Sequence, residues 1–442
     1  MKTGKFSFIF KGLSAFIFSM LTLTSSGQVL DSSIVKTRDL KKEDILFLES
    51  SIGDINVKTW DKNELRVEYI IYAEARSQKE LSAFRNKFKQ AIEDQIKNND
   101  QGKVYASMPF NTIQINGSYV KMTFKGDDEK FELKELKCTL LVSMPAINSL
   151  NLRSNFNKVS IENLNSDATI EVNSTHFKMG DCKSLNLKTN FSKDMQIGNV
   201  ESALMNINSC DLKMGKIETD LSLKSNFSHI EIEKIGNKAD IVLNSSSFET
   251  TDIKQLNFKG NFVRNFKANT IDSAKISLNS SEFEVDKISR IDIDRTSFSN
   301  FRIGEADNIQ IGASSSSRFF IDQVNSVESP SCSFSSFTIN NLKNRFKTTA
   351  RSGNVQIKNI LSGFDEININ GSFVDIDMHV AVNSNYLISA DLVFPNYNFS
   401  DLVYENHEKD MSHELIKGSK GNKQLASSKI NLICQSCKIT LN

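Results

Sequence analysis

The sequence predicts a mainly β protein, in which a small α+β head with one helix precedes a β-solenoid of stacked turns. Three observations predict this fold class. Alternating polar and apolar segments recur at a fixed spacing from residue 150 onward. The chain is rich in Ser, Asn and Phe, with 57, 45 and 31 residues of each. It has only 4 Pro, which suits continuous strand pairing because proline lacks the backbone N–H that a ladder needs.

Residues 1–27 have the pattern of a secretory signal peptide. Lys2, Lys5 and Lys11 precede an apolar stretch from Leu13 to Leu23, and Ser25 to Gly27 are small residues suited to cleavage. The alternative is an uncleaved membrane anchor, but this apolar stretch is shorter than the roughly 20 residues that a spanning helix needs. No cysteine follows it, which excludes a lipoprotein anchor here. We therefore expect export to the periplasm, the outer-membrane surface or the exterior, with no transmembrane segment after signal cleavage.

Residues 28–148 are expected to form the head. Strand-like runs occur at Ile45–Glu49, Gly53–Trp60 and Leu65–Tyr72, and Asp61 to Asn63 are predicted as a hairpin turn. A second hairpin is predicted with Asn116-Gly117 at its turn. A long strand over 131–144 is expected to end at Pro145.

One helix is predicted over residues 77–98. Ser77-x-x-Glu80 is a capping box, which satisfies free backbone N–H groups at a helix start. An apolar stripe with helical spacing follows: Leu81, Phe84, Phe88, Ile92 and Ile96. We expect this helix to lie across the sheet of the head.

Residues 149–403 are expected to form the solenoid. The repeated segments start at Leu150, Ile170, Leu185, Met205, Leu221, Ile241, Leu256, Ile276 and Ile291. Steps of about 20 and 15 residues alternate along this series and give a super-repeat of 35 or 36 residues over two turns. The first and third positions of each segment are apolar and should face inward, as in a strand with one wet face. The fifth position is small and should form a tight corner.

An aromatic residue or leucine follows each predicted corner. These residues are Phe156, Phe177, Phe191, Leu212, Phe227, Phe248, Phe262, Phe283 and Phe298. We expect them all to face inward and to stack from turn to turn. On this interpretation Phe191→Asp or Phe227→Asp would collapse the stack, because each would bury an unpaired charge.

The fourth position alternates basic residues with asparagine. Its members are Arg153, Asn173, Lys188, Asn208, Lys224, Asn244, Lys259 and Asn279. One hypothesis is a binding stripe of cations along one face. The simpler one is that asparagine keeps like charges one turn further apart and so reduces repulsion between stacked strands.

The C-terminal part is expected to differ from the repeats. Residues 404–428 have no apolar period and are predicted as an exposed loop. Residues 429–442 alternate again, and we expect these last strands to return and cap the open end of the solenoid.

Six cysteines are scattered along the chain, at positions 138, 182, 210, 332, 434 and 437. Cys434-x-x-Cys437 is the only close pair, and it lies in a strand-like context rather than at the helix start that a redox motif normally occupies. Inert thiols are the simplest interpretation; a local disulfide and a functional redox or metal pair are the alternatives.

No set of residues predicts catalysis, cofactor binding or a metal site. Of the five histidines, His407 and His413 share one segment with Glu405, Glu408 and Asp410, so a loop metal site is the sharper hypothesis and solvated residues the simpler one. The acids that a β-helix enzyme could use, Asp252, Asp286, Asp292 and Asp294, fall mostly at outward positions. The balance of 54 basic and 53 acidic residues gives no general attraction to nucleic acid.

Several segments resemble the bacterial "putative adhesin" or beta-strand-repeat family of exported cell-envelope proteins. SIGDINVKTWDKNELRVE is similar to the family's opening, and EARSQKELSAFRNKF and LLVSMPAINSLNL to its helix and its strand–proline junction. LNLKTNFSKDMQIGNV and LSLKSNFSHIEIEKIG resemble its repeat unit, with Phe in place of the usual Tyr. The resemblance covers about residues 45–400 and the final strands. It implies a β-solenoid at the cell envelope and carries over no catalytic motif.

Two hypotheses for function follow. The first is an exported, non-enzymatic envelope protein, an adhesin or interaction scaffold whose solenoid face contacts an envelope protein or a glycan. The alternative is a carbohydrate-active or carbohydrate-binding β-helix protein. A groove lined by acids from neighbouring turns would favour the alternative, whereas a polar Ser, Asn and Lys face would favour the scaffold.

Overall fold

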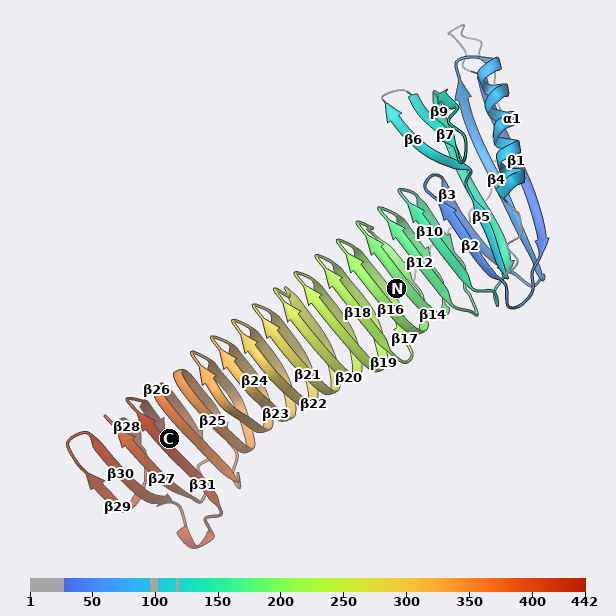
Figure 1. Cartoon of the computed structure of the whole chain (residues 1–442). Coiled ribbons are helices and arrows are strands. Elements are labelled where there is room, and N and C mark those ends of the chain that lie inside the picture. Colours follow the sequence, from blue (N-terminus) through green and yellow to red (C-terminus); the bar gives the residue numbers. More distant parts are fainter. Residues whose placement is uncertain (1–27, 96–101, 117–118) are drawn as a thin grey trace, which may run out of the picture.

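The chain folds into a long β-solenoid with the head at its N-terminal end (Figure 1). The computed structural model describes residues 28–95, 102–116 and 119–442. Strands make up 73% of the structure, and the solenoid has about 13 turns. The predicted fold class is therefore confirmed. The predicted signal peptide over residues 1–27 lies outside the described residues, as do Ile96 and Gly117.

The predicted helix is α1 (Gln78–Gln95). The N–H of Glu80 donates to Ser77 Oγ over 3.2 Å, so Ser77 caps the helix start as expected. The side chains of Leu81, Phe84, Phe88 and Ile92 are buried. Phe84 and Phe88 pack on aromatic rings of a small antiparallel sheet made of β6 (Phe110–Asn116), β7 (Tyr119–Phe124) and β8 (Lys130–Leu133).

The head contains a strand that the sequence pattern does not show. β1 (Gln28–Asp39) pairs antiparallel with β4 (Glu64–Ala75) along its whole length. Of the twelve side chains of β1 only Leu30 is buried, so the strand carries no apolar alternation.

One predicted hairpin is wrong. Asp61 to Asn63 do connect β3 (Asp54–Trp60) to β4, but these two strands do not pair. β9 (Glu135–Pro145) lies between them, parallel to β3 and antiparallel to β4. A short polar turn between two alternating runs predicts a hairpin only when no later strand enters between them. The second predicted hairpin is confirmed, because β6 and β7 pair with Asn116 opposite Tyr119.

The first turn of the solenoid comes from strands that the sequence placed in the head. β2 (Ile45–Ser50) pairs parallel with β10 (Leu150–Asn155), and β3 pairs parallel with β11 (Lys158–Ile161). β5 (Lys103–Ser107) continues the same sheet beyond β2. Residues 64–145 are therefore inserted between the first and second turns, and the head and solenoid share one sheet.

The stack continues by parallel pairing of each turn with the next. Its strands are β12 (Ala168–Asn173), β13 (His176–Met179), β14 (Cys182–Asn190), β15 (Met195–Ile197), β16 (Val200–Asn208), β17 (Asp211–Ile217), β18 (Leu221–Asn226), β19 (His229–Asn244), β20 (Ser247–Asn261), β21 (Asn265–Asn279), β22 (Glu282–Ser297), β23 (Asn300–Ser315), β24 (Arg318–Ser333), β25 (Ser336–Ile360) and β26 (Glu366–Val380).

In the observed pairing, the residues of every second turn are shifted by two positions from the alignment that the sequence predicted. Ile170 lies beside Leu187, Leu187 beside Met205 and Met205 beside Leu223, so equivalent residues are 17 or 18 apart, not 15 or 20. The super-repeat of 35 or 36 residues is unchanged. Because side chains alternate between faces with a period of two, a slip of two residues keeps every inward position inward. The predicted first and third positions are accordingly buried, whereas the corner was misplaced on alternate turns.

Buried aromatic rings do stack, but the predicted column is correct for only four of its nine members, because Phe177, Leu212, Phe248 and Phe283 are buried as expected. Phe248, Phe266, Phe283, Phe301, Phe319 and Phe337 occupy one inward column on consecutive turns, with centroid distances of 4.9 to 5.9 Å. Phe156, Phe191, Phe227, Phe262 and Phe298, which were expected to join such a stack, are instead exposed. This removes the basis for expecting Phe191→Asp or Phe227→Asp to bury a charge.

The C-terminal end is built differently from the expected cap. β31 (Ser428–Gln435) lies between β26 and β27 (Tyr386–Val393), parallel to both, and β32 (Lys438–Leu441) lies between β26 and β28 (Asn396–Phe399). The last strands thus form a turn inside the stack. The end is covered by β30 (His413–Lys420), antiparallel to β27, and by β29 (Val403–Lys409), antiparallel to β30 (Figure 1).

The predicted exposed loop over 404–428 is therefore wrong, since it contains these two strands and the short 3-10 helix η1 (Lys423–Leu425). Every side chain of β29 is exposed, which explains why its sequence shows no apolar period. Charged residues on such an edge discourage pairing with another chain.

Candidate functional site

The most unusual surface of the molecule is a corner of the solenoid at which every turn has a left-handed residue. These residues alternate in space between phenylalanine and serine: Phe156, Ser174, Phe191, Ser209, Phe227, Ser245, Phe262, Ser280, Phe298, Ser316, Phe334, Ser352, Phe373, Ser436 and Phe394. Their φ values all lie between 47° and 59°. We call the eight phenylalanines of this series the corner row.

The alternation follows the order of the turns in space and not the order of the chain. Ser436 directly follows the C-terminal strand β31 and lies between Phe373 of the preceding turn and Phe394 of the following one. The inserted strand therefore supplies the serine that the alternation needs at this place. This argues that the spacing of the phenylalanines along the edge is itself a property of the fold.

Hydrogen bonds hold each corner in its left-handed conformation. The N–H of Phe191 donates to the carbonyl of Asn208 over 3.0 Å, and the N–H of Ser209 donates to that of Asn226 over 2.9 Å. The residue after the corner is a buried Ser, Thr, Cys or Val on most turns. Where it is serine, its hydroxyl accepts the equivalent N–H of the turn before. An example is Ser228 N–H to Ser246 Oγ over 3.1 Å. These ladders fix the backbone regardless of which side chain the corner carries.

Phenylalanine is a poor choice for such a corner on grounds of stability. A left-handed conformation costs a non-glycine residue about 1–2 kcal/mol, and for bulky residues it is rare. The rings gain little in return, since Phe156 is 78% exposed and the other members are 55–66% exposed. Serine serves the same corner on the intervening turns. Residues that break a local rule without a packing gain point to function.

Basic residues accompany the first five members of the corner row. Arg153, Lys188, Lys224, Lys259 and Arg295 each precede a corner phenylalanine by three residues and are exposed. Arg153 and Lys188 both pair with Glu171, at 3.4 and 3.1 Å. Within the described part of the chain, Lys224, Lys259 and Arg295 have no ion-pair partner.

The predicted single column of alternating Asn and cations is therefore two columns. In the true register Arg153, Glu171 and Lys188 lie side by side. Asparagines form their own column immediately before the corner, in which Asn190 Nδ2 donates to Asn173 Oδ1 and Asn173 Nδ2 donates to Asn155 Oδ1, each over 2.8 Å. Cations do occur only on alternate turns here, but the residues between them are Glu171, Asn206, Val242 and Ser277, and none of these is an asparagine that was predicted to separate the cations.

A groove runs beside the corner row on the face that carries these cations. Its volume is about 540 Å³. Lys259 and Arg295 line it, together with Asn261 and Ser297, which directly precede Phe262 and Phe298. Rings, cations and amides thus share one edge of the molecule. The sequence signal that could have revealed this edge is the recurring tetrapeptide of a basic residue, a small residue, Asn or Ser, and Phe.

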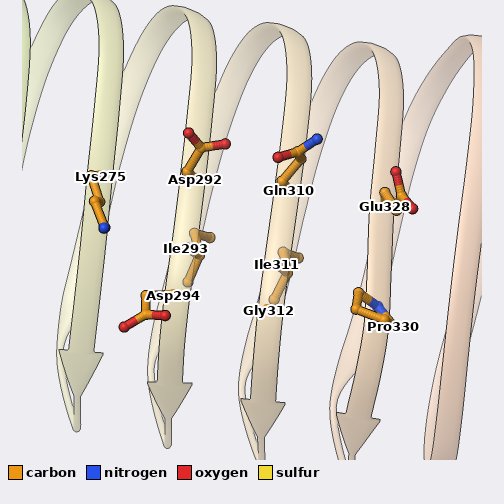
Figure 2. A pocket seen from close by; sticks show the side chains of 9 residues that line it. All are labelled: Lys275, Asp292, Ile293, Asp294, Gln310, Ile311, Gly312, Glu328 and Pro330. Carbon is orange, nitrogen blue, oxygen red and sulfur yellow. The ribbon is translucent and has the colours of Figure 1, made fainter.

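A second groove contains the acids that the sequence singled out (Figure 2). It has a volume of about 410 Å³ and lies over β21 to β24, where Lys275, Asp292, Gln310 and Glu328 form one outward column. The next outward positions are Asp294, Gly312 and Pro330. The pairing register shifts at Asp294 between β21 and β22 and at Pro330 between β24 and β25, so the strands bulge there. The groove is a consequence of this stack of bulges.

The acids do not form a paired catalytic centre. The carboxylates of Asp292 and Asp294 point away from each other in Figure 2, and Asp292 pairs with Arg290 at 3.2 Å. Asp252 pairs with Lys234 at 3.2 Å, one turn before the groove, and Asp286 is exposed elsewhere on β22. Of the acids considered from sequence, only Asp292 and Asp294 lie in the groove, and Glu328 is an addition that sequence analysis missed.

The histidines of the C-terminal segment bind separate carboxylates. His407 Nε2 lies 2.9 Å from Glu414, and His413 Nε2 lies 2.7 Å from Asp391. Buried Glu414 also contacts Lys409 Nζ at 2.6 Å and accepts the hydroxyl of Tyr397 over 2.7 Å. Among the described residues there is no group of three or more His, Cys, Asp or Glu that could hold a metal ion.

The six cysteines are buried free thiols in this structure. Burial raises the pKa of Cys138 and of Cys182 to about 12. Cys434 lies in β31, as its alternating context predicted, whereas Cys437 lies between the corner residue Ser436 and the start of β32. A hydrogen bond between the two thiols raises the pKa of Cys434 and lowers that of Cys437.

The fold and surfaces define a parallel β-solenoid with an exposed aromatic edge. No family model and no curated protein matches the chain. Solved structures with a similar trace include a "putative cell adhesion protein" from Clostridium sporogenes, 8% identical with a TM-score of 0.16, covering 93% of this chain and 99% of that one. Two from Parabacteroides distasonis, a "putative adhesin" and a "putative lipid binding protein", are each 12% identical, with TM-scores of 0.19 and 0.18.

Both Parabacteroides distasonis structures match 76% of this chain, and the matches cover 97% and 96% of the two proteins. No helix of residues 28–95, 102–116 and 119–442 is long and apolar enough to cross a membrane.

Proposed function

We propose that this chain is an exported, non-enzymatic protein of the cell envelope that acts as an interaction scaffold, with the corner row as its contact surface. The single observation that carries the proposal is that eight exposed phenylalanines recur on every second turn, in a backbone conformation that serine occupies equally well in between. Neither the stacking of the turns nor the core needs these rings. Adhesion to an envelope protein or a surface is the activity that such an edge supports best.

The test has two parts. Fractionation and protease shaving of intact cells would establish where the chain resides; cytoplasmic retention would contradict the proposal. The second part compares the purified protein with the variant F191S/F227S/F262S/F298S for retention on isolated cell-envelope fractions. The proposal expects retention by the wild type and loss in the variant.

A carbohydrate-active or carbohydrate-binding β-helix is the second candidate. The observation that favours it is the groove of Figure 2, which is lined by Asp292 and Asp294 from β22 and by Glu328 from β24, two turns further along the stack. The test is release of reducing ends from a panel of polysaccharides by the wild type and by D292N/D294N. Activity that the variant lacks would favour this candidate over the scaffold.

A further inference from the structure

We propose that the corner row docks the solenoid edgewise onto an anionic lipid surface, a proposal that rests on the interaction-scaffold function above. The phenylalanines would enter the apolar boundary of the bilayer, and the cations beside them would contact lipid phosphates. The argument has three steps, which concern the shape of the edge, the chemistry of its rings and its charge.

The edge is convex and regularly spaced. Each phenylalanine is the left-handed corner residue of its turn, and its ring is more than half exposed. Because stacked strands are about 4.8 Å apart, members of the row are about 10 Å apart and the row is about 67 Å long. Isolated rings on a ridge cannot enclose a ligand, whereas a flat and deformable surface can admit any number of them without a matched pocket for each.

The rings carry no polar group. Sugar-binding platforms and protein contacts are rich in Trp and Tyr, which combine an apolar body with a hydrogen-bonding tip. The corner row is made of phenylalanine alone, and the whole chain has one Trp and seven Tyr. An apolar wedge with basic residues next to it is instead the pattern of proteins that lie in the membrane interface.

The charge of this edge determines which kind of surface it can bind. A basic residue lies three positions before each of the first five rings: Arg153, Lys188, Lys224, Lys259 and Arg295. At the same position before the four serines that lie between these rings, Glu171 is the one acid. Lys224, Lys259 and Arg295 have no ion-pair partner within the described residues. Two copies placed edge to edge would bring two rows of cations together. An anionic surface is complementary to the edge, and each cation close to such a surface adds to the attraction.

The experiment measures sedimentation of the full chain with vesicles of phosphatidylcholine and with vesicles of phosphatidylcholine mixed with phosphatidylglycerol. We expect binding to the mixed vesicles that weakens with added salt. The variant F191S/F227S/F262S/F298S should lower the partition coefficient by about tenfold or more, since the lost rings supply apolar burial. K224Q/K259Q/R295Q should weaken binding to mixed vesicles selectively.

The substitutions have matched controls in the chain itself. Each Phe→Ser variant reproduces the residue that the fold uses on the next turn, so its thermal midpoint should equal that of the wild type. Ser245→Phe, which adds a ring between Phe227 and Phe262, should raise the partition coefficient.

Three results would overturn the proposal. One is that the folded wild type does not bind the mixed vesicles. Another is that the Phe→Ser variant binds them as well as the wild type does. The third is that the rings are needed only for dimerisation, or for binding a soluble anionic polysaccharide, without vesicle binding. This third result leaves the scaffold function intact, whereas retention on envelope fractions that is independent of the rings contradicts that function itself.

Discussion

Phe191 and Ser209 occupy the same corner on consecutive turns and share one backbone conformation, with φ of 54° and 55°. The N–H of each donates to a carbonyl of the next turn. The solenoid therefore treats a large apolar side chain and a small polar one as equivalent at this corner. The two side chains therefore differ in the surface that they present to the surroundings of the molecule, and not in their effect on the backbone.

The first prediction compares an exposed with a buried phenylalanine. Phe227→Ser should leave the free energy of unfolding within about 0.5 kcal/mol of the wild type, as for most surface changes. Phe248→Ser should lose about 3–5 kcal/mol, because Phe248 is fully buried and stacks on Phe266 at 5.3 Å. Urea unfolding of both variants measures this. Equal losses would show that the corner rings are structural.

The second prediction concerns the buried hydroxyl ladder. Ser246→Ala would leave the buried N–H of Ser228 without its acceptor and should cost about 1–3 kcal/mol. Ser246→Cys is the matched control, because Cys210 occupies this position on another turn and its Sγ accepts the N–H of Ser192 over 3.4 Å. The cysteine variant should retain most of the stability in thermal unfolding. If both variants unfold with the wild type, the ladder contributes nothing.

The third prediction concerns pH. Hydrogen bonds from Lys409 and His407 lower the pKa of Glu414 from its ordinary value of 4.5 to about 2. The ionised carboxylate therefore stabilises the fold fully above pH 4.5, and the contribution disappears as the pH falls toward 2. Glu414→Gln should lower the thermal midpoint at pH 7, with a deficit that shrinks over this interval. Glu408→Gln, on exposed β29, is the control and should have little effect. A deficit that does not vary with pH would contradict the assignment.

The fourth prediction concerns the inserted C-terminal strands. Deletion of residues 428–442 removes β31 and β32, which separate β26 from β27. The segment 381–427 should then lose its parallel partner, become sensitive to protease and exchange its amide hydrogens rapidly. A simple cap could be removed without these effects, so continued protection of β27 and β30 would contradict the observed pairing.

The period of the fold could be predicted from sequence because alternation and a repeat of 35 or 36 residues survive an alignment error of two residues. Leu152 and Ile170 were assigned to different positions of the repeat but are neighbours, and both are buried as expected. The corner row could not be predicted in the same way. Phenylalanine is normally buried, so Phe191 and Phe248 were taken as one column, although one points outward and the other inward.

The order of the strands at the two ends of the solenoid could not be predicted from the sequence pattern, for a different reason. Alternation identifies a strand and its buried face but not its neighbour. β9 enters between β3 and β4, and β31 enters between β26 and β27, through pairings with residues far away in the chain. The acidic groove was anticipated only through Asp292 and Asp294, because the bulges that form it depend on the register of several turns.

The most direct test of the corner row as a contact surface is a paired measurement on the wild type and F191S/F227S/F262S/F298S. It combines the binding isotherm for isolated envelope fractions with the thermal unfolding midpoint of each protein. The account predicts the same midpoint for both and an affinity for the envelope that is at least about tenfold weaker in the variant. Unchanged affinity, or a large fall in the midpoint, would contradict it.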